Sequence, residues 1–180
     1  MTLAVASVVE SLVTLAQPWK DLYDDTTAVS VAVTFVHLAA LFVGGGIALA
    51  TDRATLRAVG GAAPERERQL ADLGLTHRVV LGGLAVALLS GILLFLADVE
   101  TFATSLTFWV KMGLVALLLL NGLVMSRIER ALQARAADTT GPTAERSEDA
   151  ILWQRLRVSA ATSATLWLVT LLAGVTLMST

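Results

Sequence analysis

The 180-residue sequence contains no cysteine, three prolines and two histidines, and only 16% of its residues are charged. The absence of cysteine excludes disulfide bonds, iron–sulfur clusters and thiolate metal sites. Hydrophobic residues make up 56% of the chain, above the roughly 45–50% that is typical of soluble domains. The composition therefore predicts an integral membrane protein.

Four apolar stretches account for this composition, at residues 28–50, 79–97, 106–125 and 158–178. Each has close to the ~20 residues that a helix needs to cross the hydrocarbon of a bilayer. None shows the alternation of apolar and polar residues that is typical of membrane β-strands. We therefore expect an all-α fold, an integral membrane four-helix bundle that forms a single membrane domain over residues 1–180.

The first twenty residues form a separate element. Apolar residues recur there at helical spacing: Leu3, Val5, Val8, Val9, Leu12, Val13 and Ala16. A signal peptide is not expected, because a basic leading region is missing and Glu10 interrupts the apolar stretch. The pattern predicts an amphipathic helix over residues 1–20 on the outer membrane surface, ended by Pro18 and anchored by Trp19. Packing of this helix against a protein partner, or against a second copy in a homo-oligomer, is an equal alternative.

The connections between the spans contain residues that indicate where helices start and break. Gly60 and Gly61 precede Pro64 and Glu65, which together predict a helix start that leads into the second span. After the third span a helical extension is expected through Arg135, followed by a flexible stretch at residues 138–143. Neither connection is long enough to form a second domain.

The arginines predict the orientation. Every arginine of the chain flanks or lies in one of two connections, between spans one and two or between spans three and four. By the positive-inside rule both connections face the cytoplasm, so that the N- and C-termini of this multi-pass protein lie outside. The topology already accounts for the basic residues, and nucleic-acid binding is not expected.

Two ionisable residues lie inside the apolar spans, His37 in the first and Lys111 in the third. Such residues are costly at membrane depth and indicate a functional site. An imidazole is a common axial ligand of haem iron, and a lysine amine can bind iron when it is deprotonated. At 1.5 Å per residue, His37 lies roughly 14 Å and Lys111 roughly 8 Å below the outer surface. Gly44, almost two turns after His37, would leave room for a porphyrin on the same helix face.

Each residue also has a structural interpretation. His37 can bond to Thr34 or to a hydroxyl on a neighbouring helix, and Lys111 can extend its amine to the outer interface. His77 lies roughly 15 Å deeper than His37, on the cytoplasmic side. This difference in depth disfavours the binding of one haem by both His37 and His77. As an alternative, His77 and Arg78 could contact haem propionates there.

Three stretches resemble a known superfamily. "VHLAALFVGGGIAL" in span one, "HRVVLGGLAVALLSGILLFLA" in span two and "FWVKMGLVALLLLNGLVM" in span three are similar to small four-helix membrane proteins. These include the bacterial haem-binding protoporphyrinogen oxidase family and the copper resistance D domain. The resemblance implies a bacterial inner-membrane protein that binds b-type haem through His37 and Lys111, with Trp109 as the preceding aromatic. Leu41 and Phe42 stand where the family often has a tryptophan.

The sequence thus predicts a protein that binds haem b and transfers electrons or, as an oxidoreductase, carries out a membrane redox reaction. The alternative is a non-catalytic accessory subunit of a larger respiratory or photosynthetic complex. A copper or ion transporter is less favoured, because cysteine is absent and Met112 and Met125 are not clustered.

Overall fold

The computed structural model describes residues 3–137 and 145–177. Every regular element in this part of the chain is a helix. The elements are α1 (Leu3–Asp25), α2 (Thr27–Val59), α3 (Ala63–Ala97), α4 (Val99–Thr104), α5 (Leu106–Ala137) and α6 (Glu145–Leu177). Four of them, α2, α3, α5 and α6, are long and apolar enough to cross a membrane.

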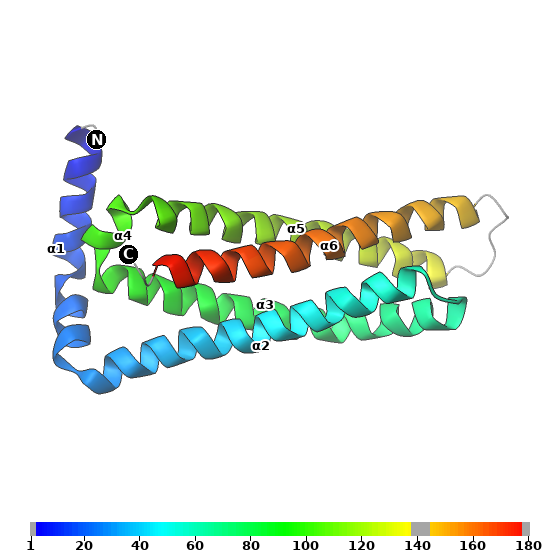
Figure 1. Ribbon diagram of the computed structural model, residues 1–180, viewed down its shortest axis with the longest axis horizontal. Helices are drawn as coiled ribbons and strands as arrows, with labels where there is room; N and C mark the ends of the chain where they lie inside the picture. The colour runs from blue at the N-terminus through cyan, green and yellow to red at the C-terminus, as the bar shows by residue number, and fades with distance from the viewer. Residues whose placement is uncertain (1–2, 138–144, 178–180) are drawn as a thin grey trace.

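The four long helices run side by side (Figure 1). Helices α2 and α3 form one hairpin, α5 and α6 face each other as a second pair, and the two pairs meet mainly where α2 packs on α6. Each helix extends beyond its predicted apolar span. The predicted start of α3 is confirmed at Ala63, where the Glu65 side chain accepts a hydrogen bond from the Ala62 amide at 2.9 Å. The predicted extension through Arg135 is also confirmed, whereas the stretch at 138–143 lies outside the described residues.

The first hairpin is held by a close approach of two glycines. A Cβ atom placed on Gly83 of α3 would lie 3.0 Å from the Gly44 Cα of α2. Small residues permit such backbone contact, which gives membrane helices their van der Waals attraction. Gly44 and Gly83 therefore set the distance between α2 and α3.

Apolar side chains fill the space between the two pairs in two clusters. One lies toward the end where α2 joins α3 and contains Leu70, Leu73, Met125, Ile128, Leu132, Trp153, Leu156 and Ala160. The other contains Ala48, Leu118 and Trp167. Large apolar side chains such as Phe42 and Leu106 are in turn largely exposed. Apolar surfaces of this extent suit a lipid environment.

Helix α1 lies crosswise at the other end of the long helices (Figure 1). The expectation that Pro18 ends this helix is wrong, because α1 continues through Pro18 to Asp25. Contacts to α3 accompany the continuation: Trp19 Nε1 donates to the Leu93 carbonyl at 2.9 Å, and Lys20 Nζ donates to the Ala97 carbonyl at 3.2 Å. These bonds compensate for the backbone hydrogen bond that is missing at Pro18, because proline has no N–H to donate.

The connection between α3 and α5 contains a short helix that the sequence analysis did not predict. Helix α4 begins after Asp98, whose side chain accepts a hydrogen bond from the Thr101 amide at 3.3 Å. Aspartate is a favoured residue at this position, because its carboxylate accepts from an amide of the first turn. The cap is local and involves only neighbouring residues, so it could have been predicted.

Candidate functional site

His37 points from α2 toward α3. Its Nδ1 atom lies 3.0 Å from the Ala87 carbonyl oxygen and 3.0 Å from Ser90 Oγ. Its ring lies against Gly91, where an added Cβ would be 3.2 Å from His37 Cε1. The absence of a side chain at Gly91 therefore leaves the space that the half-buried imidazole occupies.

The hydrogen bonds of Ser90 determine which ring nitrogen of His37 carries the proton. The Ser90 hydroxyl donates to the Val86 carbonyl at 2.6 Å, so its oxygen acts as an acceptor toward His37. The Ala87 carbonyl can only accept. His37 Nδ1 must therefore be the donor, and in the neutral imidazole the lone pair lies on Nε2. This arrangement is typical of metal-binding histidines, which donate their other N–H to a backbone carbonyl.

Lys111 reaches the same level from α5. Its half-buried side chain lies against Gly174 of α6, where an added Cβ would be 3.6 Å from Nζ. His37 is on α2 and Lys111 on α5, and over the described residues these two helices make no direct packing contact. The two ionisable residues of the predicted site therefore belong to different helix pairs, His37 to α2–α3 and Lys111 to α5–α6.

Aromatic side chains lie beside this site. Phe95 of α3 stacks on Phe108 of α5 with ring centroids 5.2 Å apart, and Phe108 also contacts Phe102 of α4 at 5.7 Å. Phe95 is one turn beyond Gly91, and Phe108 is one turn before Lys111. The aromatic group therefore lies between the His37–Lys111 level and the end of the helices that α1 covers.

Gly44 shares a helix face with His37, as predicted, since both residues contact α3. Its neighbour, however, is Gly83, whose backbone fills the space beside it. The glycine that makes room for the His37 ring is Gly91 of the facing helix. The sequence could not indicate Gly91, because which residues of α3 face His37 depends on how the two helices pack.

His77 and Arg78 lie at a different level of α3. Ten residues separate His77 from Ala87, which corresponds to about 15 Å along a helix. The structure does not bring His77 together with His37. Arg78 is exposed, whereas His77 is half-buried and turned toward α5.

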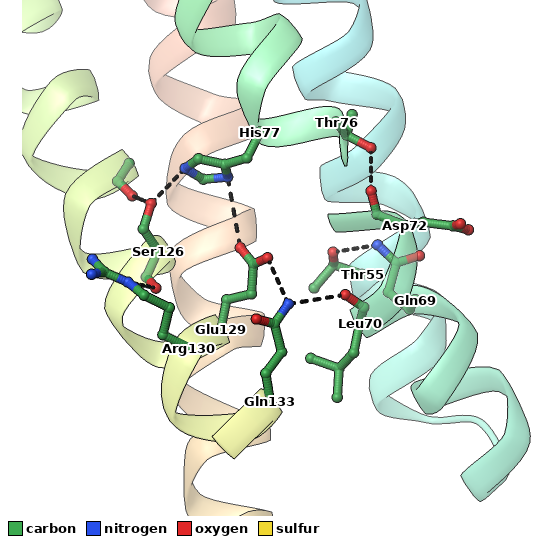
Figure 2. Close-up of polar contacts among 11 residues, drawn as sticks. Thr55, Gln69, Leu70, Asp72, Thr76, His77, Ser126, Glu129, Arg130 and Gln133 are labelled. Carbon is green, nitrogen blue, oxygen red and sulfur yellow. Dashed lines mark hydrogen bonds and ion pairs between the residues drawn. The ribbon is translucent and has the colours of Figure 1, made fainter. Parts of the chain in front are cut away.

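Figure 2 shows a polar network around His77 that joins α3 to α5. His77 Nε2 is hydrogen-bonded to Ser126 Oγ, and His77 Nδ1 lies 3.8 Å from Glu129 Oε2. Gln133 Nε2 donates to Glu129 Oε1 at 3.1 Å and to the Leu70 carbonyl at 3.3 Å. The sequence analysis missed Glu129, which lies in the charged extension beyond the third apolar span.

Two further polar contacts link the helices. Asp52 of α2 is 2% exposed and accepts a hydrogen bond from Ser163 of α6, while its Oδ2 atom meets no hydrogen-bond partner among the described residues. Asn121 of α5 donates to the Ser159 carbonyl at 3.0 Å and accepts from the Ser159 hydroxyl at 3.0 Å. Buried polar groups of this kind are typically paired across membrane helices.

The described residues contain no group of three or more histidine, aspartate and glutamate side chains that could hold a bare metal ion. Haem iron differs from a bare ion in needing only one or two protein ligands. Comparisons with protein-family models, curated proteins and solved structures gave no match to this chain. The site must therefore be interpreted from its own geometry.

Proposed function

We propose that this protein is a four-helix membrane bundle that binds b-type haem and transfers electrons within the bilayer. The observation that carries the proposal is the hydrogen bonding of His37. Because Ala87 and Ser90 hold Nδ1 as a donor, the lone pair of Nε2 remains for iron. His37 would thus hold the haem iron through Nε2.

Lys111 is the proposed second ligand. It comes from α5 of one helix pair, while His37 comes from α2 of the other. Between them the haem would supply one-electron chemistry. The protein would orient the iron through these two side chains and exclude water with the apolar residues of the long helices, two properties that influence the potential of a haem.

The membrane arrangement forms part of the proposal. The long helices span a bacterial inner membrane with both termini outside, and α1 lies on the outer surface. The support is the placement of the arginines, together with the position of α1 at the end opposite the α2–α3 connection (Figure 1). Because the natural chain lacks cysteine, single introduced cysteines can be labelled in intact cells to test which ends are outside.

The ligand assignment is tested by visible absorption of the purified protein, with haem quantified after extraction. His37→Ala should lose the haem. The matched control is His77→Ala, which removes the other histidine of the chain and should keep it. Haem retained at the wild-type level in His37→Ala contradicts the assignment.

Lys111 is tested in the same way. Lys111→Ala should shift the spectrum of the oxidised haem, because the iron would exchange one axial ligand for another. Lys20→Ala removes the other lysine of the chain and should leave the spectrum unchanged. A preparation that stays colourless despite an adequate haem supply would refute haem binding and favour an accessory subunit.

A further inference from the structure

The His77 network lies next to an open cavity. The cavity has a volume of about 550 Å³ and is lined by Glu67, Leu70, Ala71, Gln133 and Ala136. This volume far exceeds the ~30 Å³ that one water molecule occupies in the liquid. Gln133 both lines the cavity and donates to Glu129. A chain of polar groups therefore leads from the cavity through Gln133 and Glu129 to His77 (Figure 2).

The charged partner of His77 is well shielded from solvent. The side chain of Glu129 is 7% exposed and that of His77 is 21% exposed. A buried carboxylate is costly unless it is paired or protonated. The Gln133 amide satisfies one oxygen of Glu129, and the other faces His77. This second oxygen is paired with a charge only when His77 is protonated.

The heavy atoms of the network suit two states that differ by one proton. Ser126 has a single hydroxyl proton but two acceptors, the Gly122 carbonyl at 2.9 Å and His77 Nε2. When Ser126 donates to Nε2, a neutral His77 carries its proton on Nδ1, next to the Glu129 carboxylate. When Ser126 donates to Gly122, its oxygen can accept from Nε2–H, and a proton on Nδ1 as well then makes His77 a cation next to the Glu129 carboxylate.

Among the residues that the structure describes, few other charges face this pair. On α5, Arg130 interacts electrostatically with Glu129. On α3, Glu67 lines the cavity and Asp72 is exposed, with its carboxylate turned away from the network (Figure 2). From α6, the neighbouring cluster contributes the uncharged Trp153 and Leu156. His77 and Glu129 are therefore the groups that exchange the proton.

We propose that His77 and Glu129 form a proton-binding site that water reaches through the cavity at the ends of α3 and α5. In the loaded state His77 carries a proton on both ring nitrogens and forms an ion pair with Glu129 across 3.8 Å, and Ser126 accepts the hydrogen bond from Nε2. In the unloaded state Ser126 donates to Nε2. The site does not depend on haem, since it involves neither His37 nor Lys111.

The proton is detected by ¹⁵N NMR of histidine-labelled protein, which contains only His37 and His77. In the wild type, the ring nitrogens of His77 should change protonation state between alkaline and acidic pH. Glu129→Gln should weaken the response of the His77 nitrogens to acid relative to the wild type, because it removes the carboxylate that faces Nδ1. Asp72→Asn removes an exposed carboxylate of α3 and should leave this response unchanged.

Two results would overturn the proton site. One is a wild-type His77 whose nitrogen signals do not respond to pH, a measurement that requires no variant to fold. The other is a Glu129→Gln protein that matches Asp72→Asn in its His77 response.

Water access is tested with single cysteines in this cysteine-free chain. Ala71→Cys should react with a water-soluble maleimide, because Ala71 lines the cavity. Leu123→Cys places a thiol on α5 where the natural side chain is exposed and apolar, and lipid should protect it. Equal and slow labelling of both would refute the water-filled route.

Discussion

A single methyl group placed between α2 and α3 should separate the two helices. In Gly83→Ala the new Cβ would lie 3.0 Å from Gly44 Cα and 3.3 Å from the Ala40 carbonyl oxygen. Both are backbone atoms, so no side chain can rotate away to relieve the contact. The neighbouring Gly82→Ala is the matched control, because among the described residues nothing lies within 4 Å of a Cβ built there.

The two substitutions share one effect and differ in another. Each replaces glycine by alanine in the same helix, which favours the helix by up to about 1 kcal/mol. Only Gly83→Ala adds overpacking, which typically costs about 1–3 kcal/mol. Gly83→Ala should therefore be less stable than Gly82→Ala by about 1–3 kcal/mol, roughly a 5- to 150-fold change in the unfolding equilibrium.

The difference is measured by reversible unfolding in mixed detergent micelles, followed by circular dichroism. Gly44→Ala should fall between the other two variants, because its Cβ would meet Gly83 Cα at 3.4 Å, an ordinary contact distance. Equal unfolding free energies for the Gly82 and Gly83 variants would refute the close approach of α2 and α3.

Two further predictions concern single contacts. Gly91→Ala places a Cβ 3.2 Å from His37 Cε1 and should displace the imidazole and reduce the haem content. The control is Gly113→Ala, because among the described residues nothing lies within 4 Å of a Cβ built there. Equal haem content in the two variants would argue against this position of the His37 ring. Trp19→Phe removes the hydrogen bond to the Leu93 carbonyl, which lowers the stabilising free energy by about 1 kcal/mol. Amide hydrogen exchange in α1 should therefore become faster. Unchanged exchange would mean that this bond does not hold α1 against α3.

The sequence predicted the helices well because the information is local. Apolar stretches of sufficient length and the residues at the start of α3 determine where helices form, and these features lie within a few residues of each other. The depths of His37 and Lys111 were predicted in the same local way, since the rise per residue converts sequence position into depth. These predictions needed no knowledge of which helices touch.

The residues that the analysis missed depend on packing between distant segments. Asp52 follows the first apolar span closely and resembles an interfacial residue, but α6 buries it next to Ser163. Glu129 lies among arginines in a stretch that resembles a solvated helix face, yet it turns toward α3. Likewise, Pro18 would end an isolated helix, whereas contacts with α3 keep α1 continuous. Helical spacing gives no information about the neighbour that a given face meets.

Helix α3 contributes to both proposed sites. Ser90 contacts His37, and His77 faces Glu129. His77 lies thirteen residues before Ser90, about 20 Å away along the helix. The Gly44–Gly83 contact lies between these levels and fixes α3 against α2. Because effects of changes more than ~10 Å apart without shared partners usually add, loss of haem in His37→Ala should leave proton binding at His77 intact. A change in both properties would mean instead that α3 moves as one body and transmits the perturbation along its length.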